Sequence, residues 1–341
     1  MAARFVRHKK LYSTGENFMK VVTAAVAAFT LSVAGVFSAG AQDFPNRQIR
    51  VVVPFPAGGA VDTTARIIGN RAAEAAGQPI IIDNRGGAAG NIGADAVAKS
   101  APDGYSVLQT VNGLSLSPSL YKKLPFDPVK DFVPVVQFTT SPLLIVASAK
   151  APITSLKELI ALAKQKPGEL NFGSTGIGIP LHLTMEMLKG AAGIDIVHVP
   201  FKGDAPLLQS LIAGDVQVAC VPFATALQHI EAGTLRALAV TTAQRVSVLA
   251  SVPTVAESGF PGFESSSWQG WFVPTGTPRD VVMKLNSYGR KALDAPDVIE
   301  KLKSFGNVPV GNSPEEFDAF FKADVAKFAK VVKEAKIPQL D

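Results

Sequence analysis

The sequence predicts an α/β protein made of two lobes. The chain has 341 residues, 47% hydrophobic and 18% charged, which is a globular composition with enough length for two cores. Short β-branched runs alternate with Ala- and Leu-rich stretches of helical periodicity, and the loops between them are rich in glycine. Repeated strand–loop–helix units form parallel sheets flanked by helices, and ligands bind at the carboxyl ends of their strands.

The N-terminal segment is predicted to be an export signal. Residues 21–37 form an uncharged run rich in Ala and Val, and Ala39-x-Ala41 after it fits a signal-peptidase site. We therefore expect cleavage after Ala41 and a mature protein in the periplasm. A membrane anchor is the alternative, but the run is short for a span and ends in small residues. Either Met1 or Met19 is the start, because Met19 would open a compact signal unaided.

Charge and cysteine content limit the classes of partner and of crosslink that the chain can have. The formal net charge is +5, but residues 1–41 hold five basic residues and one acidic residue, which leaves +1. We therefore expect no nucleic-acid partner. Cys220 is the single cysteine, so an intrachain disulfide is excluded, and its apolar neighbours predict a buried strand.

The first strand–loop–helix unit predicts an anion-binding loop. A β-branched run at 51–53 leads into a Pro- and Gly-rich stretch at 54–59, and a helical pattern opens at Asp62 and stops at Gly77. Glycines let an anion approach free backbone N–H groups at the positive end of a helix. An ordinary βα turn is the alternative for this loop taken alone. Asp62 is expected to be the helix N-cap, and contact with a ligand can coexist with that role.

The same periodicities predict the remaining elements. Further strands are predicted at 79–84, 105–111, 142–147, 170–173, 196–200, 235–242 and 268–274. Helices are predicted up to about Lys99, after a cap at Thr154 or Ser155, after the loop at 174–180, from Leu207 to Gly214, and over 279–295 and 314–334. Residues 114–131, polar and Pro-rich, are expected to form a surface excursion.

The arrangement of strand, Gly-rich loop and helix recurs at 170–181 and at 196–207. Loops from two lobes would then face each other across a cleft of the size of a small anion. The strands that include 143–147 and 268–274 are expected to cross between the lobes, and such a two-segment hinge lets them close. We predict a signal peptide over 1–41, a first lobe over 42–142 and 268–341, and a second lobe over 143–267.

Six segments together resemble one family. They are Pro-Phe-Pro-Ala-Gly-Gly-Ala-Val-Asp at 54–62, Asn-Arg-Gly-Gly-Ala-Ala-Gly-Asn-Ile-Gly at 84–93, and the segments 101–105, 173–178, 252–257 and 271–278. Essentially the whole mature chain resembles the Bug family of extracytoplasmic solute receptors, the binding components of tripartite tricarboxylate transporters. The resemblance implies a two-lobe periplasmic binding protein fold, type II-like (Venus flytrap). Each lobe would be a mostly parallel sheet flanked by helices, with two hinge crossings.

The resemblance also implies function and partners. It implies a monomeric receptor without a cofactor that binds a small organic carboxylate and delivers it to the membrane components of a tripartite tricarboxylate transporter. The implied ligand contacts are Phe55, Ala57, Gly58, Gly59 and Asp62 in the first loop, Asn112 at a strand end, Ser174, Thr175, Gly176, Gly178 and His182 in the second lobe, and Gly203 and Asp204 in the last loop.

Several of these residues have a second interpretation. His182 could donate to a carboxylate or serve as a capping or packing histidine, and Asp204 is first expected to cap its helix. Residues 221–224 depart from the polar turn expected in the family, which leaves open an aromatic wall at Phe223. Trp268 and Trp271 are expected to pack between the lobes.

Sequence motifs argue against an enzyme. The chain has no phosphate-binding loop with Lys-Ser/Thr, no complete dinucleotide fingerprint and no His-Glu-x-x-His, and the three histidines after residue 41 are too widely spaced to predict a metal site. No base is placed beside Ser174 by the sequence. A receptor for a membrane sensor kinase and an exported α/β hydrolase remain the alternatives. The carboxylate is left open among aliphatic di- and tricarboxylates, acidic amino acids, and nicotinate-like or aromatic acids.

Overall fold

The computed structural model describes residues 44–340. The chain divides into two units, 1–46 and 47–341, and all the described helices and strands lie in the second. The predicted signal peptide, its cleavage after Ala41 and both candidate starts lie outside the described residues. Within the described range, every helix is too short or too polar to cross a bilayer.

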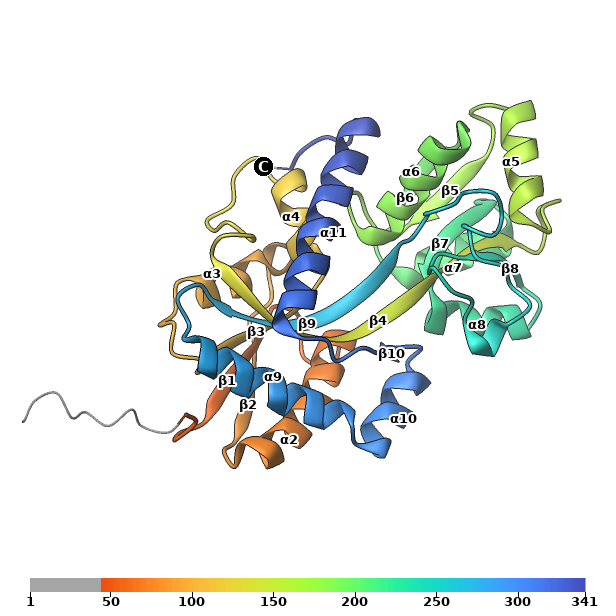
Figure 1. Cartoon of the computed structure of the whole chain (residues 1–341). Coiled ribbons are helices and arrows are strands. Elements are labelled where there is room, and N and C mark those ends of the chain that lie inside the picture. The colour runs from red at the N-terminus through yellow and green to blue at the C-terminus, as the bar shows by residue number, and fades with distance from the viewer. Residues whose placement is uncertain (1–43, 341) are drawn as a thin grey trace, which may run out of the picture. The chain divides into compact units, whose positions relative to one another are not determined.

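The second unit is built on one mixed sheet flanked by helices (Figure 1). In the described part of the chain the strand order is β2-β1-β3-β9-β4-β7-β5-β6, and β8 and β10 also pair with β4. The strands are β1 (Ile49–Val53), β2 (Ile80–Asn84), β3 (Ser106–Val111), β4 (Phe132–Ser148), β5 (Asn171–Ser174), β6 (Val197–Pro200), β7 (Val218–Pro222), β8 (Leu235–Val240), β9 (Ser266–Pro274) and β10 (Val308–Pro309).

The helices follow the strands in sequence. They are α2 (Ala60–Ala76), α3 (Asn91–Ala98), α4 (Gly113–Leu120), α5 (Leu156–Gln165), α6 (Pro180–Ala192), α7 (Asp204–Ala213), α8 (Phe223–Glu231), α9 (Arg279–Leu293), α10 (Pro296–Ser304) and α11 (Pro314–Glu334). Ser155 caps α5 by accepting the backbone N–H of Glu158, as predicted, and α2 ends at Gly77 with φ of 65°.

Strand β4 organises the sheet. Its residues 132–142 pair antiparallel with β9, and its residues 143–148 pair antiparallel with β7 and β8. Parallel pairs flank this centre, β2-β1-β3 on one side and β7-β5-β6 on the other. Figure 1 shows β4 and β9 running together between two groups of helices.

We call β1–β3, β9, β10 and residues 132–142 of β4 the first half of the sheet, and β5–β8 with residues 143–148 the second half. The pairing partners of β4 change where the sequence places the lobe boundary. The exact lobe ranges stay a prediction.

Each half has its own core. Phe172, Met185 and Cys220 belong to the core of the second half, and Cys220 is fully buried, as predicted. In the first half, Trp268 packs against Phe317 and other aromatic rings. The predicted packing of the tryptophans between lobes is wrong. Trp268 is directed toward α11, while Trp271 contacts Phe138 of β4, so both rings lie within the first half.

The segment after β3 also differs from the prediction. Residues 113–120 form helix α4 instead of a surface excursion, although Pro118 lies inside it. Leu116 and Leu120 are buried against Phe328 of α11, in a cluster that also contains Leu183 of α6. Burial of this apolar face outweighs the low helix propensity of Ser and Pro.

Candidate functional site

A cavity of about 590 Å³ has walls from both halves of the sheet. It is lined by the starts of α2, α4, α6, α7 and α8, by residues 141–143 of β4, by Ser267 and Gln269 of β9, and by residues 305–307. Such a volume suits a small organic ligand.

Five helices begin on this wall. Their N-cap residues make no side-chain hydrogen bond to the first turn; they are Gly59 (α2), Asn112 (α4), Ile179 (α6), Gly203 (α7) and Pro222 (α8). Backbone N–H groups of a first turn have no partner within the helix, and the helix dipole makes this end positive. Among the residues that line the cavity there is no Lys, Arg or His, and Asp204 is the single charged residue. The positive potential of this wall therefore comes from backbone groups, an arrangement that suits an anion.

Asp62 shapes the loop before α2. The sequence predicts that Asp62 is the N-cap of α2, and this prediction is wrong. Helix α2 starts at Ala60, and its N-cap is Gly59 in extended conformation. The buried carboxylate of Asp62 instead accepts hydrogen bonds from the Gly58 N–H (2.8 Å) and from Arg66 Nε (3.0 Å). A third bond comes from Asn84 Nδ2 at 3.0 Å.

The protonation state of Asp62 follows from these contacts. Burial raises the pKa of the Asp62 carboxyl, but the hydrogen bonds from Arg66, Gly58 and Asn84 and the charge of Arg66 outweigh burial. The pKa therefore lies below its ordinary value. Asp62 remains a charged acceptor that fixes the loop 55–59.

Ser174 begins the corresponding loop of the second half. It is fully buried, and its Oγ lies 2.6 Å from His198 Nε2 and 2.7 Å from the carbonyl oxygen of Gly176. The structure thus places an imidazole beside Ser174, which the sequence does not predict. The hydroxyl has one proton, which it donates to Gly176, so we assign the proton between Ser174 and His198 to Nε2.

This pair is arranged to hold the loop. Burial lowers the pKa of His198 to about 4. Because Ser174 is buried and already donates to Gly176, its oxygen is not presented to a substrate. The serine therefore joins β5 to β6 and shapes the turn after β5.

His182 lies in the first turn of α6 and is 4% exposed. Its Nδ1 accepts a hydrogen bond of 3.0 Å from the Gly178 N–H, so Nδ1 carries no proton. Its ring stacks on His198 with 3.9 Å between centroids, and Nε2 lies 3.7 Å from Glu186 Oε1. The ring is thus a packing residue that also caps the loop.

Three of the thirteen predicted contacts line the cavity: Gly58, Asn112 and Asp204. The other ten lie outside its wall: Phe55, Ala57, Gly59, Asp62, Ser174, Thr175, Gly176, Gly178, His182 and Gly203. As contacts to a ligand, all thirteen stay predictions. Asp204 is the first residue of α7 and Gly203 its N-cap, so the expectation that Asp204 caps this helix is wrong.

The wall also contains residues that the sequence did not single out. Ile179, Pro180 and Leu181 line the cavity in place of the Gly-rich loop that precedes them. Phe223 and Phe305 also line it. The departure from the family pattern at residues 221–224 was the one sequence signal for Phe223.

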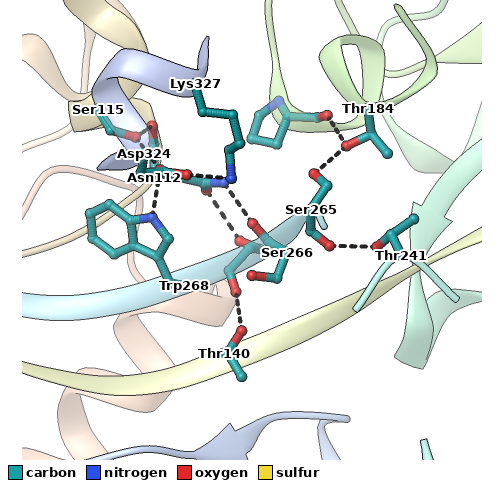
Figure 2. Close-up of polar contacts among 12 residues, drawn as sticks. Asn112, Ser115, Thr140, Thr184, Thr241, Ser265, Ser266, Trp268, Asp324 and Lys327 are labelled. Atoms are coloured by element: carbon teal, nitrogen blue, oxygen red, sulfur yellow. Dashed lines mark hydrogen bonds and ion pairs between the residues drawn. The ribbon is translucent and has the colours of Figure 1, made fainter. Parts of the chain in front are cut away.

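Polar contacts hold the start of β9 on both sides (Figure 2). In the second half, the carbonyl oxygen of Ser265 accepts from Thr241 Oγ1 at 2.6 Å, and Ser265 Oγ lies 2.7 Å from Thr184 Oγ1. In the first half, Asp324 accepts from Trp268 Nε1 at 3.0 Å and from Ser115 Oγ at 2.6 Å. Two residues, Ser266 and Ser267, lie between the anchors at Ser265 and Trp268.

The same crossing positions Asn112. Its amide donates to the carbonyl oxygen of Ser266 at 3.1 Å and accepts from Ser267 Oγ at 3.3 Å. The carboxyl end of β3 and the beginning of α4 are thereby tied to β9 next to the cavity. Within residues 44–340, no three His, Cys, Asp or Glu side chains gather into a group that could hold a metal ion.

Comparison with known proteins identifies the family. Residues 64–337 match the model of the tripartite tricarboxylate transporter family receptor. The chain belongs to this receptor family. The receptor is 36% identical over 317 residues to the protein BugT of Bordetella pertussis, covering 91% of this chain and 96% of BugT.

Two solved structures are similar to the receptor. Rpa4515 of R. palustris, solved with adipate, is 39% identical, with a TM-score of 0.74 over 87% of this chain and 100% of that chain. MatC of Rhodopseudomonas palustris, solved with bound malate, is 34% identical, with a TM-score of 0.70 over 85% of this chain and 100% of that chain. The Bug resemblance and the α/β periplasmic binding protein fold are therefore confirmed.

Proposed function

We propose that the receptor captures a small organic carboxylate in the cavity between the two halves and delivers it to the membrane components of a tripartite tricarboxylate transporter. The observation that carries the proposal is the convergence of five helix N-termini, without side-chain caps, on a cavity whose lining has no basic side chain. A carboxylate would accept hydrogen bonds from these backbone groups.

The relatives support the class of ligand. Rpa4515 and MatC are each described with a carboxylate, adipate and malate respectively. In this receptor the lining also includes Leu143, Phe223 and Phe305. We expect them to pack against the carbon skeleton of the ligand while the helix starts bind its carboxylate.

We also propose that the receptor binds without catalysis, as a monomer in the periplasm. Ser174 is buried in a structural hydrogen bond, and the cavity lining holds no histidine to act as a base. Light scattering of the mature protein tests the oligomeric state. Detection of the protein after osmotic shock of cells tests its location.

A thermal-shift screen tests ligand capture. The mature protein, residues 42–341, is screened against mono-, di- and tricarboxylates, amino acids and aromatic acids. A compound present at 100 times its dissociation constant stabilises the folded state by about 2.7 kcal/mol, which raises the melting temperature measurably. If no compound of the panel raises the melting temperature, with the protein folded and free of co-purified ligand, the proposal is contradicted.

A pair of variants tests the site. Ala224 lies exposed in the first turn of α8 and lines the cavity, while Ala232 lies exposed at the other end of the same helix, outside the wall. Ala224→Trp should fill the cavity and abolish binding of the hit from the screen. Ala232→Trp should leave it unchanged. Equal affinity in both variants would place the ligand elsewhere.

Delivery needs the membrane components. Uptake of the labelled hit by vesicles that contain the transporter should require the receptor. It should be lost with Ala224→Trp. Binding without any stimulation of uptake would favour a sensor-kinase partner instead.

A further inference from the structure

We infer that His182 is a positioning residue whose unprotonated Nδ1 holds the loop 175–179 in place, so that ligand capture weakens when His182 takes up a proton. The link to ligand capture rests on the proposed function. The effect on the loop does not, and it can be measured without a ligand.

The Gly-rich loops of the two halves are held by the same kind of hydrogen bond. The third residue of α2, Asp62, accepts the backbone N–H of Gly58 at 2.8 Å. The third residue of α6, His182, accepts the backbone N–H of Gly178 at 3.0 Å. In both cases the donor lies four residues earlier, outside the helix. The acceptors differ, because a carboxylate still accepts at mildly acidic pH whereas a protonated imidazole has no acceptor left.

The loop 175–179 connects His182 to the cavity. Gly178 has φ of 77°, and a Cβ built on it would lie 2.8 Å from Leu120 of α4. Gly178 is therefore confined between α4 and the imidazole, and the next residues, Ile179 and Pro180, line the cavity. A shift of Gly178 moves this part of the wall.

Charges around the ring give the direction of the change. On α6 itself, Glu186 Oε1 lies 3.7 Å from Nε2, on the side away from Gly178, and it is already paired with Lys189 Nζ at 3.0 Å. Burial raises the pKa of Glu186, but the bonds from His182 and Lys189 outweigh burial and hold it below the ordinary value. Glu186 is thus an anion that attracts an imidazolium ring away from the loop.

The other elements packed on α6 bring fewer charged groups to the His182 ring. His198 of β6 stays neutral down to about pH 4, given its lowered pKa. Burial raises the pKa of the Cys220 thiol on β7, so this group stays neutral as well. Helix α11 carries Lys327, Lys330 and Glu334 on the groove that Glu186 and Lys189 also line. Protonation of His182 therefore replaces the bond to Gly178 by attraction toward Glu186.

The first experiment uses the mature protein without ligand. Amide hydrogen exchange at Gly178 and Gly58 is followed by NMR between about pH 8 and pH 5, the range in which imidazoles titrate, and corrected for the intrinsic exchange rate. Protection at Gly178 should fall at least about tenfold over this pH range. Protection at Gly58 should stay constant, because Asp62 remains ionised.

Two substitutions separate positioning from packing. His182→Asn places an amide oxygen where Nδ1 lies and cannot titrate, so Gly178 should stay protected at every pH. His182→Leu keeps an apolar ring-sized group without an acceptor, so Gly178 should be unprotected at every pH. Protection that is independent of pH in the wild type, or pH dependence that persists in His182→Asn, would overturn the inference.

The second experiment measures affinity with adipate as the probe, or with the strongest compound of the thermal-shift screen. The dissociation constant of the wild type should rise more steeply between pH 8 and pH 5 than that of His182→Asn. Comparison with this variant cancels protonation of the ligand itself. If no carboxylate binds while Gly178 exchange still follows His182, the proposed function fails and the positioning role stands. Equal pH dependence in both proteins contradicts the coupling to ligand capture.

Discussion

Thr184 and Ser265 share a buried hydrogen bond of 2.7 Å between their hydroxyl oxygens, and it joins helix α6 to the beginning of the crossing strand β9 (Figure 2). Thr184 Oγ1 also donates to the carbonyl oxygen of Pro180 at 2.8 Å, so the proton between the two hydroxyls belongs to Ser265. One residue of α6 thus contacts both the cavity wall at Pro180 and the beginning of β9 at Ser265.

Thr184→Val should destabilise the protein. The substitution keeps the shape of the side chain but leaves the hydroxyl of Ser265 without its acceptor and the carbonyl of Pro180 without its side-chain donor. The free energy of unfolding should fall by about 1–3 kcal/mol, measured by urea titration. Ser265→Ala should lower the free energy of unfolding much less in the Thr184→Val variant than in the wild type. Additive effects of the two substitutions would show that the bond is not formed.

Asp62→Asn should lower stability mainly above pH 4. The folded pKa of Asp62 lies below its ordinary value, so the ionised carboxylate contributes stability above the unfolded pKa of about 3.9 and loses it as the pH falls through the folded value. We expect a loss of about 1–3 kcal/mol at pH 7 that shrinks at pH 3. Urea titrations of variant and wild type at both pH values measure it. A difference independent of pH would count against this role.

Asp204→Asn should strengthen carboxylate binding. Asp204 is the single charged residue among those that line the cavity, and it is exposed to solvent. Removal of its repulsion should lower the dissociation constant up to about fivefold at low ionic strength, with a smaller gain in salt. Isothermal titration of the ligand at two salt concentrations measures both. Weaker binding would mean that Asp204 accepts a hydrogen bond from a hydroxyl or amino group of the ligand.

Gly270→Ala should destabilise the centre of the sheet. A Cβ at this position of β9 would lie 2.5 Å from the ring of Phe317 and 2.8 Å from the carbonyl oxygen of Val136. Overpacking of this kind costs about 1–3 kcal/mol or more. The control is Gly190→Ala in α6, where a Cβ meets no atom within 4 Å and the helix should be slightly stabilised. Melting temperatures of the two variants should therefore shift in opposite directions.

Helix caps, glycine stops and hydrophobic periodicity in the sequence predicted many of the helices and strands. Ser155 caps α5, Gly77 ends α2, and α11 covers the predicted residues 314–334. Strand β4 was predicted only over 142–147, because Pro134 and the polar residues 139–141 interrupt its apolar pattern. Pairing with β9, which lies far away in the sequence, makes this stretch a strand. Helix α8 was not predicted, since its start at Phe223 follows Pro222 without a capping side chain.

Three of the residues predicted as ligand contacts lie in the lining of the cavity. Glycines marked the loops before α2, α6 and α7, and Gly58, Asn112 and Asp204 do line the cavity. The sequence could not reveal that His198 lies beside Ser174, because the two residues come from adjacent parallel strands 24 positions apart.

The continuity of β4 also affects the order in which the protein can fold during synthesis. Strands β1 to β3 are made early, but β9, which separates β3 from β4 in the sheet, ends only at Pro274. The first half therefore lacks its centre until most of the chain has been made. Such late, non-local pairing slows folding. A nascent chain of this topology therefore keeps the edges of β3 and β4 unpaired until β9 has been made, which prolongs the stage at which exposed strand edges can pair with other chains.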